Sequence, residues 1–125
     1  MDNRIIEPNE MSTGALAFMG DAVFGLLVRE ALCRSSRLPA GKLHRKSVDL
    51  VRCEGQAAAA ERLAPLLTER ERDIFMRGRN AHTSNVPRNA RPTDYHAATG
   101  LEALFGYLYL SGEDERLREL FSHII

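Results

Sequence analysis

Two apolar stretches dominate the pattern of hydrophobic and polar positions along the chain. Residues 14–28 (GALAFMGDAVFGLLV) contain a single charge, Asp21, and residues 97–110 (AATGLEALFGYLYL) contain a single charge, Glu102. An isolated ionised carboxylate in an apolar interior is costly unless it is paired or bound to a metal ion. Two such acids in one small chain indicate a shared partner, and a divalent cation is the simplest candidate because one ion can bind both carboxylates.

The polar residues that flank these stretches indicate where their helices begin and end. Ser12 or Thr13 can cap a first helix that continues to about Cys33. This helix is apolar on nearly every face, so we expect it to be central. The second stretch predicts a helix from residues 93–94 to about residues 111–112, and a last amphipathic helix follows it.

Glycines in the first helix give a further indication about its surroundings. Gly14, Gly20 and Gly25 each weaken the helix by about 1 kcal/mol relative to alanine. A helix that tolerates three of them is expected to lie against another backbone or a ligand. Ala17 and Gly25 stand four residues on either side of Asp21, which leaves room for an ion or a substrate at its carboxylate.

The segment between the two stretches predicts two further helices. One runs over about residues 42–64, and Pro65 ends or kinks it. Thr68 then opens a capping box with Glu71, which predicts a short charged helix that continues to about Arg77.

The rest of the chain shows neither helical period nor strand alternation. Residues 34–41 and 78–92 contain Gly and Pro and are expected to be loops, and loops as long as the second are often functional. We therefore expect an all-α protein of about five or more helices, in a single domain that spans residues 1–125.

Composition adds little that is specific, and it limits the classes of partner. Of the 125 residues, 17 are Lys or Arg and 17 are Asp or Glu, so a nucleic-acid surface must come from local patches. Cys33 and Cys53 match no metal-ligand spacing and suggest free thiols in a reducing compartment. The apolar stretches are shorter than the about 20 residues of a membrane span, and residues 1–10 lack a signal pattern. We expect a cytoplasmic protein without a membrane partner.

Two basic tracts without acids are candidates for phosphate binding. Residues 34–48 and residues 76–92 each contain several Lys or Arg side chains and no Asp or Glu. Such tracts are commonly only a solvated charged face, but beside an acidic pair they can also bind a nucleic-acid backbone. The sequence has few exposed aromatic candidates for stacking, so double-stranded RNA fits better than a single strand. The candidate RNA-binding residues are Lys42, His44, Arg45, Lys46, Arg77, Arg79, Asn80, His82 and Arg88.

The two lone acids have both a structural and a functional interpretation. Each could be neutralised by an Arg or His, or could point outwards. Alternatively, Asp21 and Glu102 could ligate Mg²⁺, which takes few protein carboxylates and keeps several waters. Such an ion can generate a hydroxide nucleophile and stabilise a phosphoryl transition state. The chain has no fingerprint for a nucleotide cofactor, so none is expected.

These stretches resemble the two signatures of the ribonuclease III family. Residues 15–30 (ALAFMGDAVFGLLVRE) are similar to the signature helix around Gly-Asp-Ala/Ser-Val, and residues 99–112 (TGLEALFGYLYLSG) to the second signature. The resemblance is closest to the short bacterial branch, Mini-III ribonuclease, and spans about residues 12–120. That branch also has a Lys-Leu-His segment, a Gly-Arg-Asn-Ala loop and a Val-Pro-Lys-Asn segment, matched by residues 42–44, 78–81 and 86–89.

The resemblance implies a Mg²⁺-dependent endoribonuclease that cleaves double-stranded RNA as a homodimer and matures large-subunit (23S) ribosomal RNA. It also implies that no separate double-stranded-RNA-binding domain is present. A water activated by the metal would attack the phosphodiester and leave 5′-phosphate and 3′-hydroxyl ends. Alternatives are a non-catalytic helical RNA-binding or ribosome-assembly module and a protein–protein adaptor.

The resemblance also assigns roles to residues. Asp21 and Glu102 take the positions of the catalytic, metal-binding acids. The larger enzymes have two more acids where this chain has Ala17 and Thr99. This implies a thinner shell around the ion, filled by water or Thr99. A dimer surface is expected on the glycine-bearing face of the first helix and on the C-terminal part of the second apolar helix.

Overall fold

The computed structural model describes residues 4–81 and 86–125, and within these ranges the chain is helical and has no strand. The prediction of an all-α protein is confirmed. No helix in the described part of the chain is long and apolar enough to cross a membrane. The α-helices are α1 (Thr13–Ser35), α2 (Ala40–Val51), α3 (Cys53–Leu63), α4 (Glu69–Arg79), α5 (Pro92–Leu110) and α6 (Asp114–Ser122), and two short 3₁₀ helices are η1 (Pro8–Glu10) and η2 (Ala64–Leu66).

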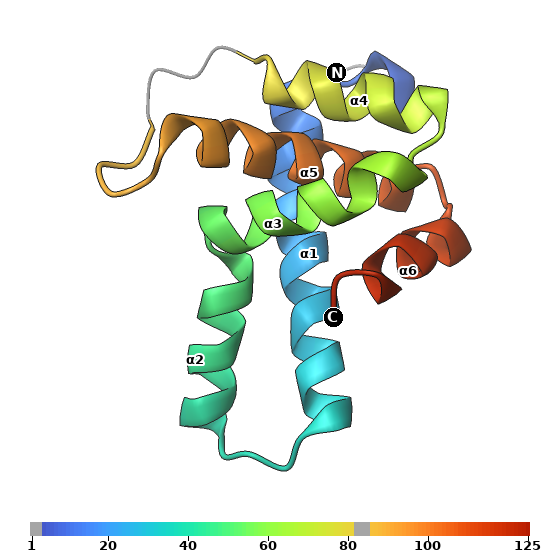
Figure 1. Ribbon diagram of the computed structural model, residues 1–125. Coiled ribbons are helices and arrows are strands. Elements are labelled where there is room, and N and C mark those ends of the chain that lie inside the picture. The colour runs from blue at the N-terminus through green and yellow to red at the C-terminus, as the bar shows by residue number, and fades with distance from the viewer. Residues whose placement is uncertain (1–3, 82–85) are drawn as a thin grey trace.

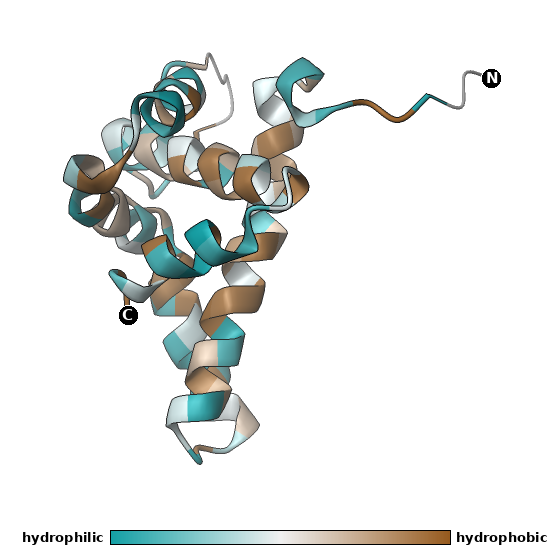
Figure 2. Ribbon diagram, turned by 90° about the vertical axis from the view of Figure 1, so that its right-hand side faces the viewer, coloured by the Kyte–Doolittle hydropathy of each residue, from teal (hydrophilic) through white to brown (hydrophobic). Residues whose placement is uncertain are grey.

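The long helix α1 and the crossing helix α5 form the frame of the molecule. Figure 1 shows α5 passing across the N-terminal half of α1, with α3 and α4 along α5 and α6 folded back beside it. The C-terminal half of α1 continues past this body and runs beside α2, to which residues 36–39 connect it. Figure 2 shows that α1 and α5 have mainly apolar sequences, whereas α6 is mainly hydrophilic.

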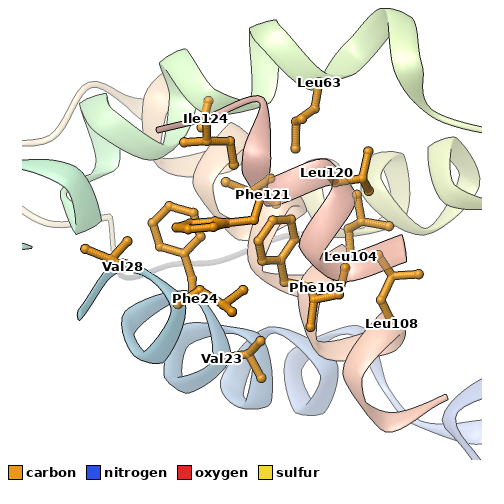
Figure 3. Packing of buried hydrophobic residues seen from close by; sticks show 14 residues of the cluster. Val23, Phe24, Val28, Leu63, Leu104, Phe105, Leu108, Leu120, Phe121 and Ile124 are labelled. Atoms are coloured by element: carbon orange, nitrogen blue, oxygen red, sulfur yellow. The ribbon is translucent and has the colours of Figure 1, made fainter. Parts of the chain in front are cut away.

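The core fills the space between α1, α3, α5 and α6 (Figure 3). The ring of Phe24 lies 5.6 Å from that of Phe105 and 6.0 Å from that of Phe121, between ring centroids. Leu63 and Leu104 are buried in the same cluster. Full burial of one such side chain contributes about 1.5–3 kcal/mol, so this cluster fixes how α5 and α6 lie against α1.

Two glycines set the closest approach of α1 and α5. A Cβ added at Gly20 would lie 1.6 Å from the backbone oxygen of Glu102, and one added at Gly106 would lie 2.0 Å from that of Leu16. Real Cβ atoms do not come so close to a backbone oxygen, so any larger residue at either position forces the helices apart. The expectation that the glycines of α1 meet another backbone is confirmed at Gly20. The face of α1 that bears Gly20 therefore packs within the chain, and the expectation that it forms a dimer surface was wrong at this position.

The first apolar helix begins as predicted, but it is not covered on every apolar face. Ser12 caps α1 as predicted, since its Oγ accepts a hydrogen bond from the Ala15 N–H at 3.0 Å. Phe18 and Leu26, however, are 84% and 61% exposed. Apolar sequence alone does not separate a face that packs against α5 from a face that nothing in the same chain covers.

The helix expected over residues 42–64 is two helices. The backbone is extended at Arg52 (φ −65°, ψ 160°), which separates α2 from α3. A Cβ at Gly55 would lie 2.7 Å from the carbonyl oxygens of Asp49 and Leu50, so the first turn of α3 folds tightly against the end of α2. We had placed Gly55 inside a continuous helix. The sharp turn directs α3 onto α5.

The predicted boundaries around α4 agree closely with the structure. Pro65 lies in the short 3₁₀ helix that follows α3. The capping box is present, because Thr68 Oγ1 accepts from the Glu71 N–H at 3.2 Å and Glu71 Oε1 accepts from the Thr68 N–H at 2.9 Å. This local motif needs no tertiary information, which explains why it could be identified from four residues.

Candidate active site

Asp21 and Glu102 meet where α1 crosses α5. The backbone of Glu102 lies against Gly20, so the next residue of α1 is placed at the same crossing. The side chains of Asp21 and Glu102 lie within hydrogen-bonding reach of each other. Both line an open cavity of about 370 Å³, together with Gly14, Ala17, Phe18, Tyr95 and Thr99. Asp21 is exposed at this cavity and Glu102 is partly buried.

The surroundings of Glu102 oppose its ionisation. Burial raises the pKa of Glu102 to about 8, and the neighbouring carboxyl of Asp21 adds to the rise through a hydrogen bond and its like charge. The side-chain amide of Gln56 opposes the rise. Among the described residues, no Arg, Lys or His forms an ion pair with either carboxylate. The interpretation that each acid is neutralised by a base therefore does not match this arrangement.

The donor atoms at this site suit a hard divalent cation. Carboxylate oxygens are ligands that Mg²⁺ prefers, and a cation between the two groups would offset the repulsion between them. The Thr99 hydroxyl donates to the Tyr95 carbonyl at 3.0 Å, so its lone pairs remain available at the cavity. In the described ranges, no group of three or more Asp, Glu, His or Cys side chains is arranged so that it could hold a metal ion. A bound Mg²⁺ would therefore keep several waters, as this ion commonly does.

Two residues at the site were missed in the sequence. Gln56 is only 3% exposed in the first turn of α3, and it influences Glu102 from there. The available signal was a lone amide directly before the run Ala57–Ala60. Phe18 places a strongly exposed aromatic ring beside Asp21. We had expected few exposed aromatic side chains, and α1 presents one at the rim of the cavity.

The candidate RNA-binding residues fall into two separate groups. Figure 1 shows that the first half of α2, which carries the α2 group, lies at the end of α2 distant from α3. In the second group, Arg77 and Arg79 lie in the last turn of α4, and Asn80 and Arg88 follow that helix. All four residues of the α2 group are exposed, namely Lys42, His44, Arg45 and Lys46. The described residues of the second group are also exposed, namely Arg77, Arg79, Asn80 and Arg88. His82 lies outside the described residues.

A larger cavity than the one at Asp21 and Glu102 lies elsewhere. It has a volume of about 570 Å³ and is enclosed by α3, α4 and the start of α5. Arg79 and Arg91 line it, but so do the acids Glu54, Glu61 and Asp94. Because both basic and acidic side chains line this cavity, it has no clear preference for an anion. Neither Asp21 nor Glu102 lines it.

A family model and a solved structure both match the part of the chain that forms the site. Residues 14–113, from the start of α1 to the residue before α6, match the family model described as the ribonuclease III domain. A crystal structure of a protein from Fusobacterium nucleatum has a TM-score of 0.81 and 26% sequence identity, and the match covers 90% of both chains.

Curated relatives extend the similarity over nearly the full sequence. The Mini-ribonuclease 3 of Symbiobacterium thermophilum is 43% identical over 117 residues, which cover 94% of this chain and 90% of the relative. The Mini-ribonuclease 3 of a Synechocystis strain is 47% identical over 114 residues, which cover 91% of this chain and 78% of the relative.

Proposed function

Because the chain belongs to the ribonuclease III family, in its Mini-ribonuclease 3 branch, we propose that it cleaves double-stranded RNA at the Asp21–Glu102 site. It is an endoribonuclease of the ribonuclease III type. One observation carries the assignment of the site. Two acids, each the only charge of its apolar stretch, meet at a helix crossing without a neutralising base among the described residues.

Asp21 and Glu102 are proposed to bind Mg²⁺ from the two facing helices. Bound there, Mg²⁺ would supply a nucleophile from water and stabilise the charge that develops on the phosphodiester. Asp21 is exposed at the mouth of the cavity, while Glu102 is partly buried and held by the rigid α1–α5 crossing. The open cavity leaves space for a phosphate beside both carboxylates. Cleavage would leave 5′-phosphate and 3′-hydroxyl ends.

The exposed basic residues of α2 and of the α4 end are proposed to bind the RNA backbone on either side of the cut. Their separation suits a long, shape-recognised duplex better than a short strand. Contacts of this kind release counterions, so the affinity for duplex RNA should fall as salt rises. We propose precursors of 23S ribosomal RNA, in the bacterial cytoplasm, as the natural substrate.

A homodimer is proposed to place one such site on each strand of the duplex. Phe18, Ala22 and Leu26 are exposed on α1 at four-residue spacing and form an apolar stripe. A two-fold interface on this stripe would cover it with the same stripe of a second copy. Leu26→Glu should therefore yield a monomer in light scattering, and an unchanged dimer would remove the stripe from the interface.

Cleavage of a duplex RNA, with and without Mg²⁺, tests the proposed activity. Wild type should cut the duplex only when Mg²⁺ is present, and Asp21→Asn and Glu102→Gln should each greatly slow the cut. Asp73→Asn is a matched control, because Asp73 is an exposed acid of α4. Full activity of either site variant would remove that residue from the mechanism. Binding without any cleavage by wild type would support the RNA-binding module instead, and no salt-dependent affinity would support the adaptor.

A further inference from the structure

Gln56 is a buried polar side chain that the fold leaves without an ordinary partner. The buried polar or charged residues in the described part of the chain are Ser47, Gln56 and Glu71. The Ser47 hydroxyl donates to the His44 carbonyl at 2.7 Å, and Glu71 accepts hydrogen bonds from its neighbours. The Nε2 atom of Gln56 is buried and has no hydrogen-bond partner of ordinary geometry. A buried amide in this condition costs free energy, so its presence calls for a function.

The turn into α3 brings Gln56 close to Glu102. Gly55 allows the first turn of α3 to fold against the end of α2, and Gln56 follows it directly. The Gln56 amide acts on Glu102 by lowering its pKa against the effect of burial. Cys53, three residues earlier and on the same helix face, has a pKa raised by burial and then by the charges of Glu54 and Glu102. Both residues of this face therefore lie near Glu102.

Two neighbours of Glu102 at the cavity are poor candidates to donate a hydrogen bond to its carboxylate. Asp21, once ionised, only accepts, and the Thr99 hydroxyl already donates to the Tyr95 carbonyl. The buried side-chain amide of Gln56 has unpaired N–H groups, which are donors that can orient the carboxylate. Hydrogen-bonded partners of this kind fix the direction of a metal-ligating carboxylate and tune its affinity.

We propose that Gln56 is a positioning residue, whose side-chain amide donates to the Glu102 carboxylate and orients it for Mg²⁺. The inference rests on the proposed function of the Asp21–Glu102 site and adds a third residue to it, from a third helix. Gln56 does not touch the RNA or the ion. Its contribution is to align the Glu102 carboxylate, so its loss should appear first in metal affinity.

Gln56→Met tests this role, because methionine keeps the length of the side chain and removes both donors. Mg²⁺ affinity is measured from the rise in melting temperature as MgCl₂ is added to protein stripped with EDTA. The apparent Kd for Mg²⁺ should rise by about 10- to 100-fold. The half-saturating Mg²⁺ concentration for cleavage should rise in parallel, and kcat should recover at high Mg²⁺. Gln56→Leu serves as a second donor-free variant.

Ala59→Gly is the matched control for a general loosening of α3. Ala59 is 2% exposed in the same helix, so this change should lower the melting temperature and leave the Kd for Mg²⁺ unchanged. A wild-type Kd in both Gln56 variants would overturn the positioning role. A wild type that neither binds Mg²⁺ nor cleaves duplex RNA would instead overturn the proposed function, so the two failures are distinguishable.

Discussion

Glu71 and Glu102 are both glutamates on helices of one small fold, and they have opposite surroundings. Glu71, 5% exposed, receives two hydrogen bonds of 2.8 Å from Arg116, while its Oε1 also accepts the Thr68 N–H. The hydrogen bonds from Arg116 lower its pKa, in spite of burial. Glu102 has an acid as its neighbour and an amide in place of an arginine, and its pKa rises to about 8.

The contrast shows that the surroundings of Glu71 stabilise its charge, whereas those of Glu102 oppose it. Glu71 joins α4 to α6 and has partners for its charge within the chain. Glu102 would be better matched by a cation that the chain does not supply. Perturbed carboxylates beside a cavity are characteristic of functional sites, whereas ion-paired ones also occur as structural elements. Residue type and position on a helix alone would have placed the two residues in one class.

The largest expected effect separates the two glutamates by activity. Glu102→Gln should lower the rate of duplex cleavage by about 10³-fold, since metal stabilisation of the transition state is worth several kcal/mol and 1.36 kcal/mol is tenfold. Its melting temperature in EDTA should not fall, because the change removes a repulsion. Glu71→Gln should give the reverse result, a lower melting temperature with cleavage retained. Loss of cleavage in folded Glu71→Gln would break the comparison.

The second effect tests the crossing that brings Asp21 to Glu102. Gly20→Ala adds a Cβ where the Glu102 backbone lies, so the helices must separate. Overpacking of this kind costs about 1–3 kcal/mol, partly offset by about 1 kcal/mol of helix propensity. Cleavage should fall by about 10²-fold, because small displacements of reacting groups are expensive.

Gly41→Ala is the control for this substitution. Gly41 lies in α2, and a Cβ there meets no atom within 4 Å. Stability and cleavage should both stay close to wild type, as judged by urea unfolding and by initial rates. Wild-type cleavage by Gly20→Ala would show that the crossing tolerates separation and does not set the site.

The same glycine shows how far sequence patterns reach at this site. The lone charges of the two stretches and the glycines beside Asp21 indicated a close contact with another backbone or a ligand, and the all-α class followed from the helical periods. The contact itself required tertiary structure, because nothing local says that Gly20 meets the Glu102 backbone. For that reason Gly20 was wrongly expected to face a second copy.

Local sequence could predict neither the helix break at Arg52 nor the ion-pair partner of Glu71, because both depend on tertiary contacts. Gly55 is tolerated in a helix, so only the contact between successive helices shows that it makes a turn. The capping box of Glu71 was identified, but Arg116 lies 45 positions away along the chain. Gln56 was hidden for the same reason, because its significance depends on which helix α3 meets.

The third effect concerns stability alone. Arg116→Ala leaves the Glu71 carboxylate buried without its charged partner, and loss of hydrogen bonds to a charged group costs about 2 kcal/mol. Urea unfolding should measure this loss, with cleavage by the folded variant unchanged. Arg118→Ala is the matched control, since Arg118 pairs with Glu30 at the surface and its loss should leave stability near wild type. Equal losses of unfolding free energy in both variants would contradict the prediction that the buried Glu71–Arg116 pair stabilises the fold more than the surface Glu30–Arg118 pair.

The smallest effect is the pH dependence that the Glu71–Arg116 pair adds to unfolding. Arg116 lowers the pKa of Glu71 in the folded protein below its ordinary value of 4.5. The unfolded chain then binds a proton more readily than the folded one, so the stabilisation is complete above about pH 4.5 and is lost as pH falls through the folded pKa. The free energy of unfolding of wild type minus that of Glu71→Gln should be constant from pH 7 to about 5 and shrink below it. A difference that stays constant down to pH 3 would mean that Arg116 does not hold Glu71 ionised.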